Sequence, residues 1–408
     1  MARGKLVPIA QLDALLASGV GFSGPSIDGT GLPRTGPRSE YYGRGDASTA
    51  QALPWMPGYA RIVCDGFVAG EPFDACPRQV LRRQLARLAQ RGMHLRTGIE
   101  PEFFLLQRGE HGSFTPADPH DRLAKPSYDL KSLPRQREFL ARLAEGLNAC
   151  GLDVFQIDHE DAHGQYELNF HHAEALASAD HLMLFKMAAQ AIAEDHGMVF
   201  SMMPKPFANQ PGSGMHFHVS LWDGEGDPVA ASTGRHFIGG VLAHSAALCA
   251  IAAPTVNSYK RLVVGESITG TSWAPAYVAH GPNNRTALVR TLAGRFEWRL
   301  PDASANPYLA TAAMIAAGLD GIERELDAGP ACEDDLFDLT LAQIRARGIG
   351  LLPQSLDEAI TAFEADAVVR GALGETLAAE LMRLKRAEWT EYARHVSDWE
   401  MQRYAAMF

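Results

Sequence analysis

Five short segments of this chain carry polar side chains at every second position, and this pattern limits what the chain can fold into. Successive side chains of a β-strand point to opposite faces, so each segment has one apolar and one polar face. The apolar faces are aromatic and aliphatic and must pack on a hydrophobic core. The segments are GIEPEFFLL, VFQIDHE, QYELNF, GMHFHVSL and GRFEWRL.

The polar faces of these strands concentrate more chemistry than a solvated surface usually does. For any one strand, water is the simplest neighbour of the polar face, and a single H-x-H pair is more often structural than a ligand pair. Taken together, the five faces favour a site. Their chemically notable residues are Glu100, Glu102, Asp158, Glu160, Glu167, His216, His218, Ser220, Arg295, Glu297 and Arg299.

This set of residue types suits a pair of hard divalent cations. Carboxylate oxygens with one imidazole match Mg²⁺ or Mn²⁺ better than zinc. Five glutamates and one histidine are enough for three protein ligands to each of two ions, with positions left for phosphate oxygens and water. Such a pair neutralises a phosphoryl group during its transfer.

Arginines are gathered in the same part of the chain. Solvation at the surface would explain one or two of them. Five within the 39 residues from 261 to 299 of an acidic chain favour a fork-like clamp for carboxylate and phosphate groups. These residues are Arg261, Arg285, Arg290, Arg295 and Arg299.

Charge, cysteine usage and hydropathy exclude several other classes of protein. The net charge of -11 argues against nucleic acid as a partner, since a phosphate-binding surface needs a basic excess. The five cysteines are far apart and form no C-x-x-C pair, which fits reduced thiols. The chain has no signal-peptide core and no apolar run long enough to span a bilayer. We therefore expect a cytoplasmic protein without a membrane partner.

The pattern along the chain predicts several elements. Residues 19–54 are rich in Gly, Pro, Ser and Thr and predict a long loop. Residues 60–65 predict one strand, and Pro77 opens an amphipathic helix that Gly92 closes. Helices are also predicted over 175–197 and, as one long element, over 374–408.

Nine segments, in order along nearly the whole chain, resemble the glutamine synthetase family. The similarity is greatest to its bacterial type III, or glutamine synthetase-like, branch, of which the gamma-glutamylmethylamide synthetases are close relatives. One such segment is a weak signal, whereas nine in register are specific. They are GFSGPSI, GDAST, GIEPEFFL, HEDAHGQYE, MPKPFANQPGSGMHFHVSL, NSYKRLV, NNRTALVR, RFEWRLPD and ANPYLATAAMIAAGLDGI.

The resemblance implies an architecture. The fold class is α+β, with a small N-terminal β-grasp domain over residues 1–74. A larger catalytic domain over 75–408 is expected to hold a curved antiparallel sheet whose polar face is turned inward. The family also implies a homo-oligomer of hexameric rings or dodecamers, with each site at a junction between subunits. Family members carry a further N-terminal helix and first strand, so we expect either a misplaced start site or a shortened N-terminal domain.

The resemblance also implies roles for individual residues. The first metal takes Glu102, Glu160 and Glu167, and the second takes Glu100, His216 and Glu297. The other residues contact substrates. Arg261, Arg285 and Arg299 bind the substrate carboxylate and the transferring phosphate, Gly212 and His218 lie near glutamate and that phosphate, Arg290 and Arg295 bind ATP phosphates, and Ser220 lies beside the nucleotide.

The implied reaction is an ATP-dependent ligation in two steps. The side-chain carboxylate of glutamate attacks the terminal phosphate of ATP, and an amine then attacks the resulting gamma-glutamyl phosphate. The amine must lose a proton to become nucleophilic. ATP and two or more divalent cations are the expected cofactors, and glutamate and a small amine are the expected partners.

Several positions depart from the family pattern. Ser23 replaces an aspartate that helps to bind and deprotonate ammonium, and Asp46 is expected to supply part of the lost charge. In the segment that closes over the site, Glu266 is the provisional counterpart of the family's glutamate. Pro211 replaces an asparagine, and Phe337 replaces a tyrosine that some bacterial members adenylylate, so that regulation is expected to be absent.

These departures leave the amine open. Ammonia and methylamine are both retained, with polyamines and other amines as further alternatives. A non-catalytic relative is a different class of alternative, but all six predicted metal ligands are present. A guanidino kinase also uses arginines and ATP, yet that reading leaves His216 and the glutamate strands unexplained.

Overall fold

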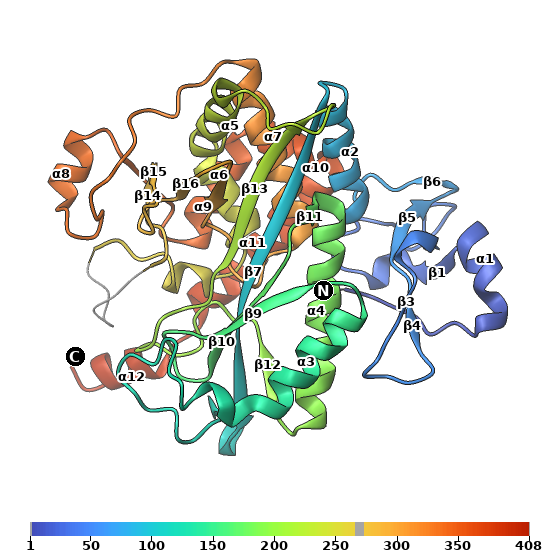
Figure 1. The fold of residues 1–408 in the computed structure, drawn as a ribbon, viewed down its shortest axis with the longest axis horizontal. Coiled ribbons are helices and arrows are strands. Elements are labelled where there is room, and N and C mark those ends of the chain that lie inside the picture. Colours follow the sequence, from blue (N-terminus) through green and yellow to red (C-terminus); the bar gives the residue numbers. More distant parts are fainter. Residues whose placement is uncertain (1, 266–272, 408) are drawn as a thin grey trace.

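The computed structural model describes residues 2–265 and 273–407, and it shows an α+β protein built on one large mixed sheet (Figure 1). Strand β7 (Met93–Arg108) is its spine and β13 (Met215–Asp223) runs antiparallel beside it. The main path of the sheet is β15-β16-β17-β13-β7-β10-β9, and β8, β11 and β12 also pair with β7. The bounds of these further strands are β8 Phe114–Pro116, β9 Val154–His159, β10 Gln165–Phe170, β11 Ala173–Glu174, β12 Val199–Ser201, β15 His280–Pro282, β16 Val289–Leu292 and β17 Arg295–Trp298.

One edge of this sheet corrects the expectation of an antiparallel sheet. Strand β15 runs parallel to β16, whereas the other strand pairs of the sheet are antiparallel. The loop between the two strands is fixed by Asn284, whose amide donates to the backbone carbonyls of Cys332 and Asp334. That segment lies far away in sequence, and periodicity within the strands does not reveal such an anchor.

The residues at the N-terminus form a separate small sheet in the order β1-β2-β5-β6. Its strands are β1 (Val20–Ser23), β2 (Glu40–Gly45), β5 (Cys64–Val68) and β6 (Glu71–Pro72). The short helix α1 (Leu12–Ala17) precedes it, and β3 (Gln51–Ala52) pairs with β4 (Ala60–Arg61). The β-grasp assignment and the boundary at residue 74 remain predictions.

Two predictions for this region are wrong. The stretch 19–54 is not one loop, because β1, β2 and β3 lie within it. Residues 60–65 do not form one strand, because the chain leaves the ladder at residues 62–63. There the amide of Val63 donates to the hydroxyl of Thr49, and its carbonyl accepts from the amide of Asp46. The turn after β2 therefore separates β4 from β5.

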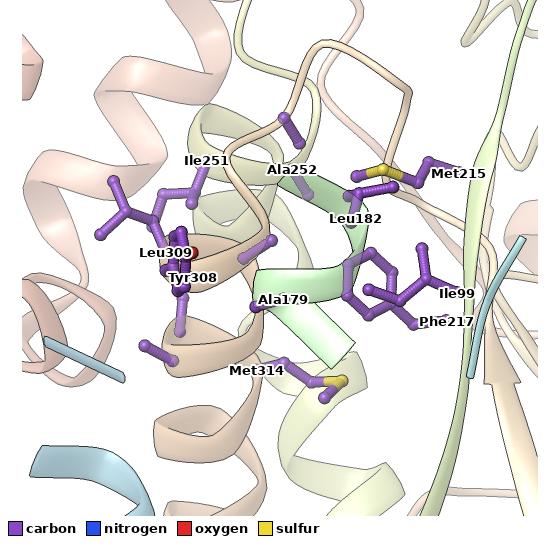
Figure 2. Packing of buried hydrophobic residues seen from close by; sticks show 14 of the residues in the cluster. Ile99, Ala179, Leu182, Met215, Phe217, Ile251, Ala252, Tyr308, Leu309 and Met314 are labelled. Carbon is purple, nitrogen blue, oxygen red and sulfur yellow. The ribbon is translucent and has the colours of Figure 1, made fainter. Parts of the chain in front are cut away.

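Helices cover the apolar face of the large sheet. Ile99 on β7 and Phe217 on β13 point toward Ala179 and Leu182 of α4 (Ala175–Asp195) (Figure 2). Behind α4 lies α7 (Pro307–Glu323), which carries Met314 into the same core. Full burial of one Ile, Leu, Phe or Met side chain stabilises the folded state by about 1.5–3 kcal/mol. This layer therefore holds in place the sheet that carries the polar residues.

The remaining helices complete this layer and the surface. The predicted helix at Pro77 is α2 (Pro77–Ala89), and the predicted helix at 175–197 is α4. The other helices are α3 (Arg137–Ala149), α5 (Ala231–Ala243), α6 (Ser245–Ala252), α8 (Leu341–Ala346), α9 (Leu356–Ala365) and α10 (Ala367–Leu373), and the short strands β14 (Tyr277–Val278) and β18 (Gly350–Leu351) pair with each other.

The predicted single helix over 374–408 is instead two helices, α11 (Glu375–Arg394) and α12 (Asp398–Tyr404). His395 is extended, and Ser397 caps α12 by accepting from the amide of Glu400. The carboxylate of Glu400 accepts from the amide of Ser397 in return, which completes a capping box. This cap begins a new helix where hydrophobic periodicity alone predicts a continuation.

Among the described residues, no single helix is both long and apolar enough to cross a membrane. Helices α5 and α6 are long and apolar enough only when they are counted together, and the chain bends by 73° between them.

Candidate active site

The register of four neighbouring strands brings the predicted ligands side by side. Strand β13 pairs His216 with Glu100 of β7 on one side and His218 with Glu297 of β17 on the other. On the far side of β7, Glu167 of β10 pairs with Glu102. Directly paired residues have their Cβ atoms about 4.5–5.5 Å apart, so strand pairing alone gathers these side chains.

The ligand atoms of these side chains form two compact groups among the described residues. Glu100, His216 and Glu297 make one group, and Glu102, Glu167 and His216 make the other. Within each group, all ligand atoms lie within 4.8 Å of one another. The second predicted metal set therefore comes together as a unit. The first predicted set comes together only in part, because Glu160 belongs to neither group and His216 is shared.

Glu102 is held from two sides by residues that the sequence did not single out as site residues. Its Oε2 atom accepts from the backbone amide of Gly214 at 2.8 Å and from Nε2 of Gln165 at 2.9 Å. A Cβ atom at position 214 would lie 2.8 Å from Nε2 of His216 and 3.0 Å from Oε1 of Glu102. Glycine at this position is therefore required by the packing of the carboxylate cluster.

The carboxyl groups on the β10 side repel one another. Burial raises the pKa of Glu167 well above its usual value, and the charges of Glu100 and Glu102 raise it further. Burial followed by the charge of Glu102 does the same to the pKa of Glu160. Burial also raises the pKa of Glu102, although the Gly214 amide works in the opposite direction. A bound cation would relieve this repulsion.

His216 on β13 and Glu297 on β17 are both in the deprotonated form that binds a metal ion. Burial, and then the charge of Arg299, lower the pKa of His216 well below its usual value, so its imidazole is neutral at physiological pH. Burial works against ionisation of Glu297, but the guanidinium groups of Arg299 and Arg290, which donate to its carboxylate, outweigh it and lower its pKa to about 2. Metal ligands must be deprotonated, and both residues meet that condition.

Three of the predicted arginines converge on Glu297 and its surroundings. Arg299 donates to Oε1 of Glu297, and Arg290 donates to Oε2 at 2.8 Å. Arg299 is buried and uses its second terminal nitrogen on the backbone carbonyl of Trp273 at 2.9 Å. Arg261 is buried behind them and donates to the backbone carbonyls of Leu300 and Arg299.

The remaining predicted substrate residues lie around this core. His218 is 3.0 Å from Oε1 of Glu100 through Nε2, and its Nδ1 accepts from Nε of Arg295. The carbonyl of Gly212 accepts from Gln165, and a Cβ at position 212 would meet the side chain of Arg261 at 3.3 Å. The hydroxyl of Ser220 accepts from the indole of Trp222 at 2.9 Å.

Arg285 lies on the surface near an acidic group formed by Asp158, Glu160 and Asp161, which we call the acidic rim. Its side chain is exposed and its charge acts on Tyr128, which also feels the charges of Glu160, Asp158 and Glu167. Burial followed by those negative charges raises the pKa of Tyr128. Arg285 is therefore free to meet an anion at the rim, unlike the three arginines bound to Glu297 or to backbone carbonyls.

Asp46 is engaged in an ion-pair network rather than left free. It pairs with Arg78 at 2.9 Å, and the hydroxyl of Ser48 and the guanidinium of Arg78 lower its pKa to about 2. Arg78 is 4% exposed and also pairs with Asp65 and Asp180 at 2.9 Å. The network ties the N-terminal sheet to helices α2 and α4, and its bonds from Asp46 to described residues stay outside the carboxylate cluster.

Ser23 ends strand β1, where its hydroxyl accepts from Ser26 at 3.1 Å on an exposed surface. It belongs to the small N-terminal sheet and not to the large one. Glu266 lies outside the described residues. The structure thus brings five of the six predicted metal ligands together with Arg261, Arg290 and Arg299. The contacts of Ser23 and Asp46 lie outside this group.

Comparison with known proteins shows the family of this chain. Residues 74–404 match the family model of the glutamine synthetase catalytic domain. A glutamate–methylamine ligase from Methyloversatilis universalis is 49% identical to this chain. The alignment covers 100% of this chain and 94% of that protein. A glutamine synthetase from Rhizobium meliloti is 37% identical, and the alignment covers 98% of this chain and 92% of that protein.

A solved GmaS–ADP complex superimposes with a TM-score of 0.91 at 38% identity, covering 99% of this chain and 93% of that one. The fold and the site define a carbon–nitrogen ligase that joins glutamate to an amine. The chain belongs to the glutamine synthetase family. The predictions of the family and of an ATP-dependent glutamate–amine ligase are confirmed.

Proposed function

We propose that the amine is methylamine and that the product is gamma-glutamylmethylamide. The observation that carries this proposal is the identity of 49% to a glutamate–methylamine ligase over the whole chain, against 37% to a glutamine synthetase. Ser23 supports it, because the family's ammonium-binding aspartate is missing there. A lost carboxylate weakens the attraction for a small cation and leaves room for a methyl group.

Two divalent cations, Mg²⁺ or Mn²⁺, are proposed to bind in the carboxylate cluster. Glu100, His216 and Glu297 would hold one, and Glu102, Glu167 and Glu160 would hold the other. The donor set is rich in oxygen with one neutral imidazole, which fits these ions. Gly214 also fits, because a Cβ there would lie 2.8 Å from Nε2 of His216. Bound cations would supply charge neutralisation for phosphoryl transfer.

In the first step, an oxygen of the glutamate side chain attacks the terminal phosphorus of ATP. The bond between that phosphorus and the bridging oxygen breaks, and ADP leaves. Arg261, Arg285 and Arg299 are proposed to hold the substrate carboxylate and the transferring phosphate. Arg285 is exposed, whereas Arg299 donates to Glu297 and Arg261 donates to the backbone carbonyl of Leu300. Arg290 and Arg295 are proposed to bind ATP phosphates, with Ser220 beside the nucleotide.

In the second step, the amine nitrogen attacks the carbonyl carbon of gamma-glutamyl phosphate. The arriving ammonium ion first gives one proton to water, because only the free amine is nucleophilic. As the carbon–oxygen bond breaks and phosphate leaves, the nitrogen gives a second proton to water and becomes an amide nitrogen. Gly212 and His218 are proposed to lie beside glutamate and the transferred phosphate. The acidic rim formed by Asp158, Glu160 and Asp161 attracts the protonated amine as it arrives.

A homo-oligomer is proposed as the working form, with hexameric rings or dodecamers as in the family. Ser23 and Asp46 would then approach the cluster of a neighbouring subunit rather than that of their own chain. The inward-polar face of the sheet and the β-grasp fold of the N-terminal domain belong to the same proposal.

The test is phosphate release from ATP with glutamate and a panel of amines. The purified protein should use methylamine with a higher kcat/KM than ammonia, and each reaction should require Mg²⁺ or Mn²⁺. A wide preference for ammonia would overturn the choice of methylamine. A preference for a polyamine would replace it with the alternative amine.

A further inference from the structure

An exposed tryptophan stands beside the carboxylate cluster without an evident structural reason. Trp273 is 46% exposed, whereas Trp298 on β17 is fully buried in the core. A large aromatic side chain left this open near a site is more informative than an exposed residue elsewhere, because aromatic side chains are enriched where ligands bind. Nothing in the family pattern described above assigns it a role.

Trp273 is anchored to the site at both ends. Its backbone carbonyl accepts from Nη2 of Arg299 at 2.9 Å, and its indole Nε1 donates to Oδ2 of Asp161 at 3.1 Å. The other oxygen of Asp161 accepts from the hydroxyl of Ser127. These bonds restrain the indole even though 46% of the residue is exposed.

The two anchors have opposite charge, and this suggests what lies between them. Arg299 reaches Glu297 in the cluster and is proposed to hold the anionic glutamate or its acyl phosphate. Asp161 follows Glu160 and belongs to the acidic rim. With these proposed roles, an anion held by Arg299 and an amine attracted by Asp161 would meet near Trp273, which is bonded to both residues.

We propose that Trp273, braced by Asp161, determines amine specificity by presenting its indole face to the alkyl group of methylammonium. An aromatic face attracts a methylated ammonium ion through its π electrons, and it shields the methyl group from water. Ammonium has no methyl group, so it gains the attraction to the π electrons but not the shielding of a methyl group from water. The inference rests on the proposed use of methylamine, and it names the residue that selects it.

The experiment compares kcat/KM for methylamine and for ammonia in the oligomeric, full-length protein. Trp273→Ala and Trp273→Leu remove the aromatic face but keep the backbone carbonyl that binds Arg299, so KM for glutamate should change little. The methylamine-to-ammonia ratio should fall about tenfold or more, since one methyl group in an apolar pocket is worth roughly 10–200-fold in discrimination. Trp273→Phe should keep most of the ratio.

Two further variants test the bracing and the position. Asp161→Asn keeps an oxygen that accepts from the indole and should keep the ratio, whereas Asp161→Ala should lower it while leaving the metal requirement unchanged. Trp399→Ala is the matched control, since Trp399 is 60% exposed on α12. It should leave both activities unchanged.

The outcomes separate the two proposals. If the wild-type protein prefers methylamine and Trp273→Ala and Trp273→Leu keep the same ratio, the role of Trp273 is refuted and the proposed function stands. If the wild-type protein prefers ammonia, the proposed function is refuted first. If Trp273→Ala is inactive with both amines, the ratio in Trp273→Leu and Trp273→Phe decides, since these side chains fill more of the same space.

Discussion

Replacing Gly214 by alanine tests whether the carboxylate cluster is built to hold cations. The added Cβ would lie 2.8 Å from Nε2 of His216, 2.9 Å from Nη2 of Arg261 and 3.0 Å from Oε1 of Glu102. Ordinary contact begins at 3.4 Å, so the imidazole must move by about 0.6 Å. Metal–ligand distances tolerate only about 0.2 Å. The change should therefore disturb the site far more than the fold.

The expected result is a 10–100-fold weaker affinity for Mn²⁺ or Mg²⁺, the size of effect that follows when the support of a ligand is altered. Isothermal titration calorimetry with Mn²⁺ measures it directly, and thermal unfolding checks the fold. Gly371→Ala is the matched control, because a Cβ there meets nothing within 4 Å on helix α10. Unchanged Mn²⁺ affinity in a folded Gly214→Ala variant would refute the assignment of the cluster as a metal site.

Two further predictions concern stability. Arg78→Met leaves three partly buried aspartates without their shared cation and should lower the free energy of unfolding by about 3–5 kcal/mol. Arg87→Met is the control, since it removes one exposed ion pair and should lower the free energy of unfolding by less than about 1 kcal/mol. Equal losses for the two variants in urea unfolding would contradict this prediction. Burial disfavours protonated His244, but hydrogen bonds to Asp366 and Asp320 outweigh it and raise its pKa. Its stabilising contribution is then full below the unfolded pKa of about 6.5 and is lost as pH rises through the folded pKa. The stability advantage of the wild-type protein over His244→Gln should shrink across that range, and an advantage that grows with pH would show that the sign is wrong.

The sequence predicted the strand faces well because their period is local. Alternation along a strand states which of its residues share a face, and this applies to Glu100, Glu102, Glu167, His216 and Glu297. Placing them in one cluster needs the order of the strands, and pairing partners such as β10 and β17 lie on opposite sides of the β7–β13 pair. The resemblance to the family supplied instead the grouping of these residues into two ligand sets.

Other parts of the site could not be read from sequence because contacts distant in the chain decide them. Glu160 follows the end of β9, so strand alternation does not fix where its carboxylate points. Asp46 lies in a motif segment, yet Arg78 binds it from another element. Gly214 and Gln165 support Glu102 through a backbone amide and a side-chain amide. The sequence signal for Gly214 was that it directly precedes the histidine-bearing strand, and the signal for Gln165 was that it shares a strand face with Glu167.

The most direct measurement is a competition between amines in one reaction. Purified protein is given ATP, glutamate and equal concentrations of methylamine and ammonium, with Mg²⁺ or Mn²⁺, and the products are separated by mass spectrometry. We predict that gamma-glutamylmethylamide forms in excess over glutamine, with one phosphate released for each amide formed. Glutamine as the main product would contradict the choice of amine, and ATP-independent formation of either amide would contradict the ligase mechanism itself.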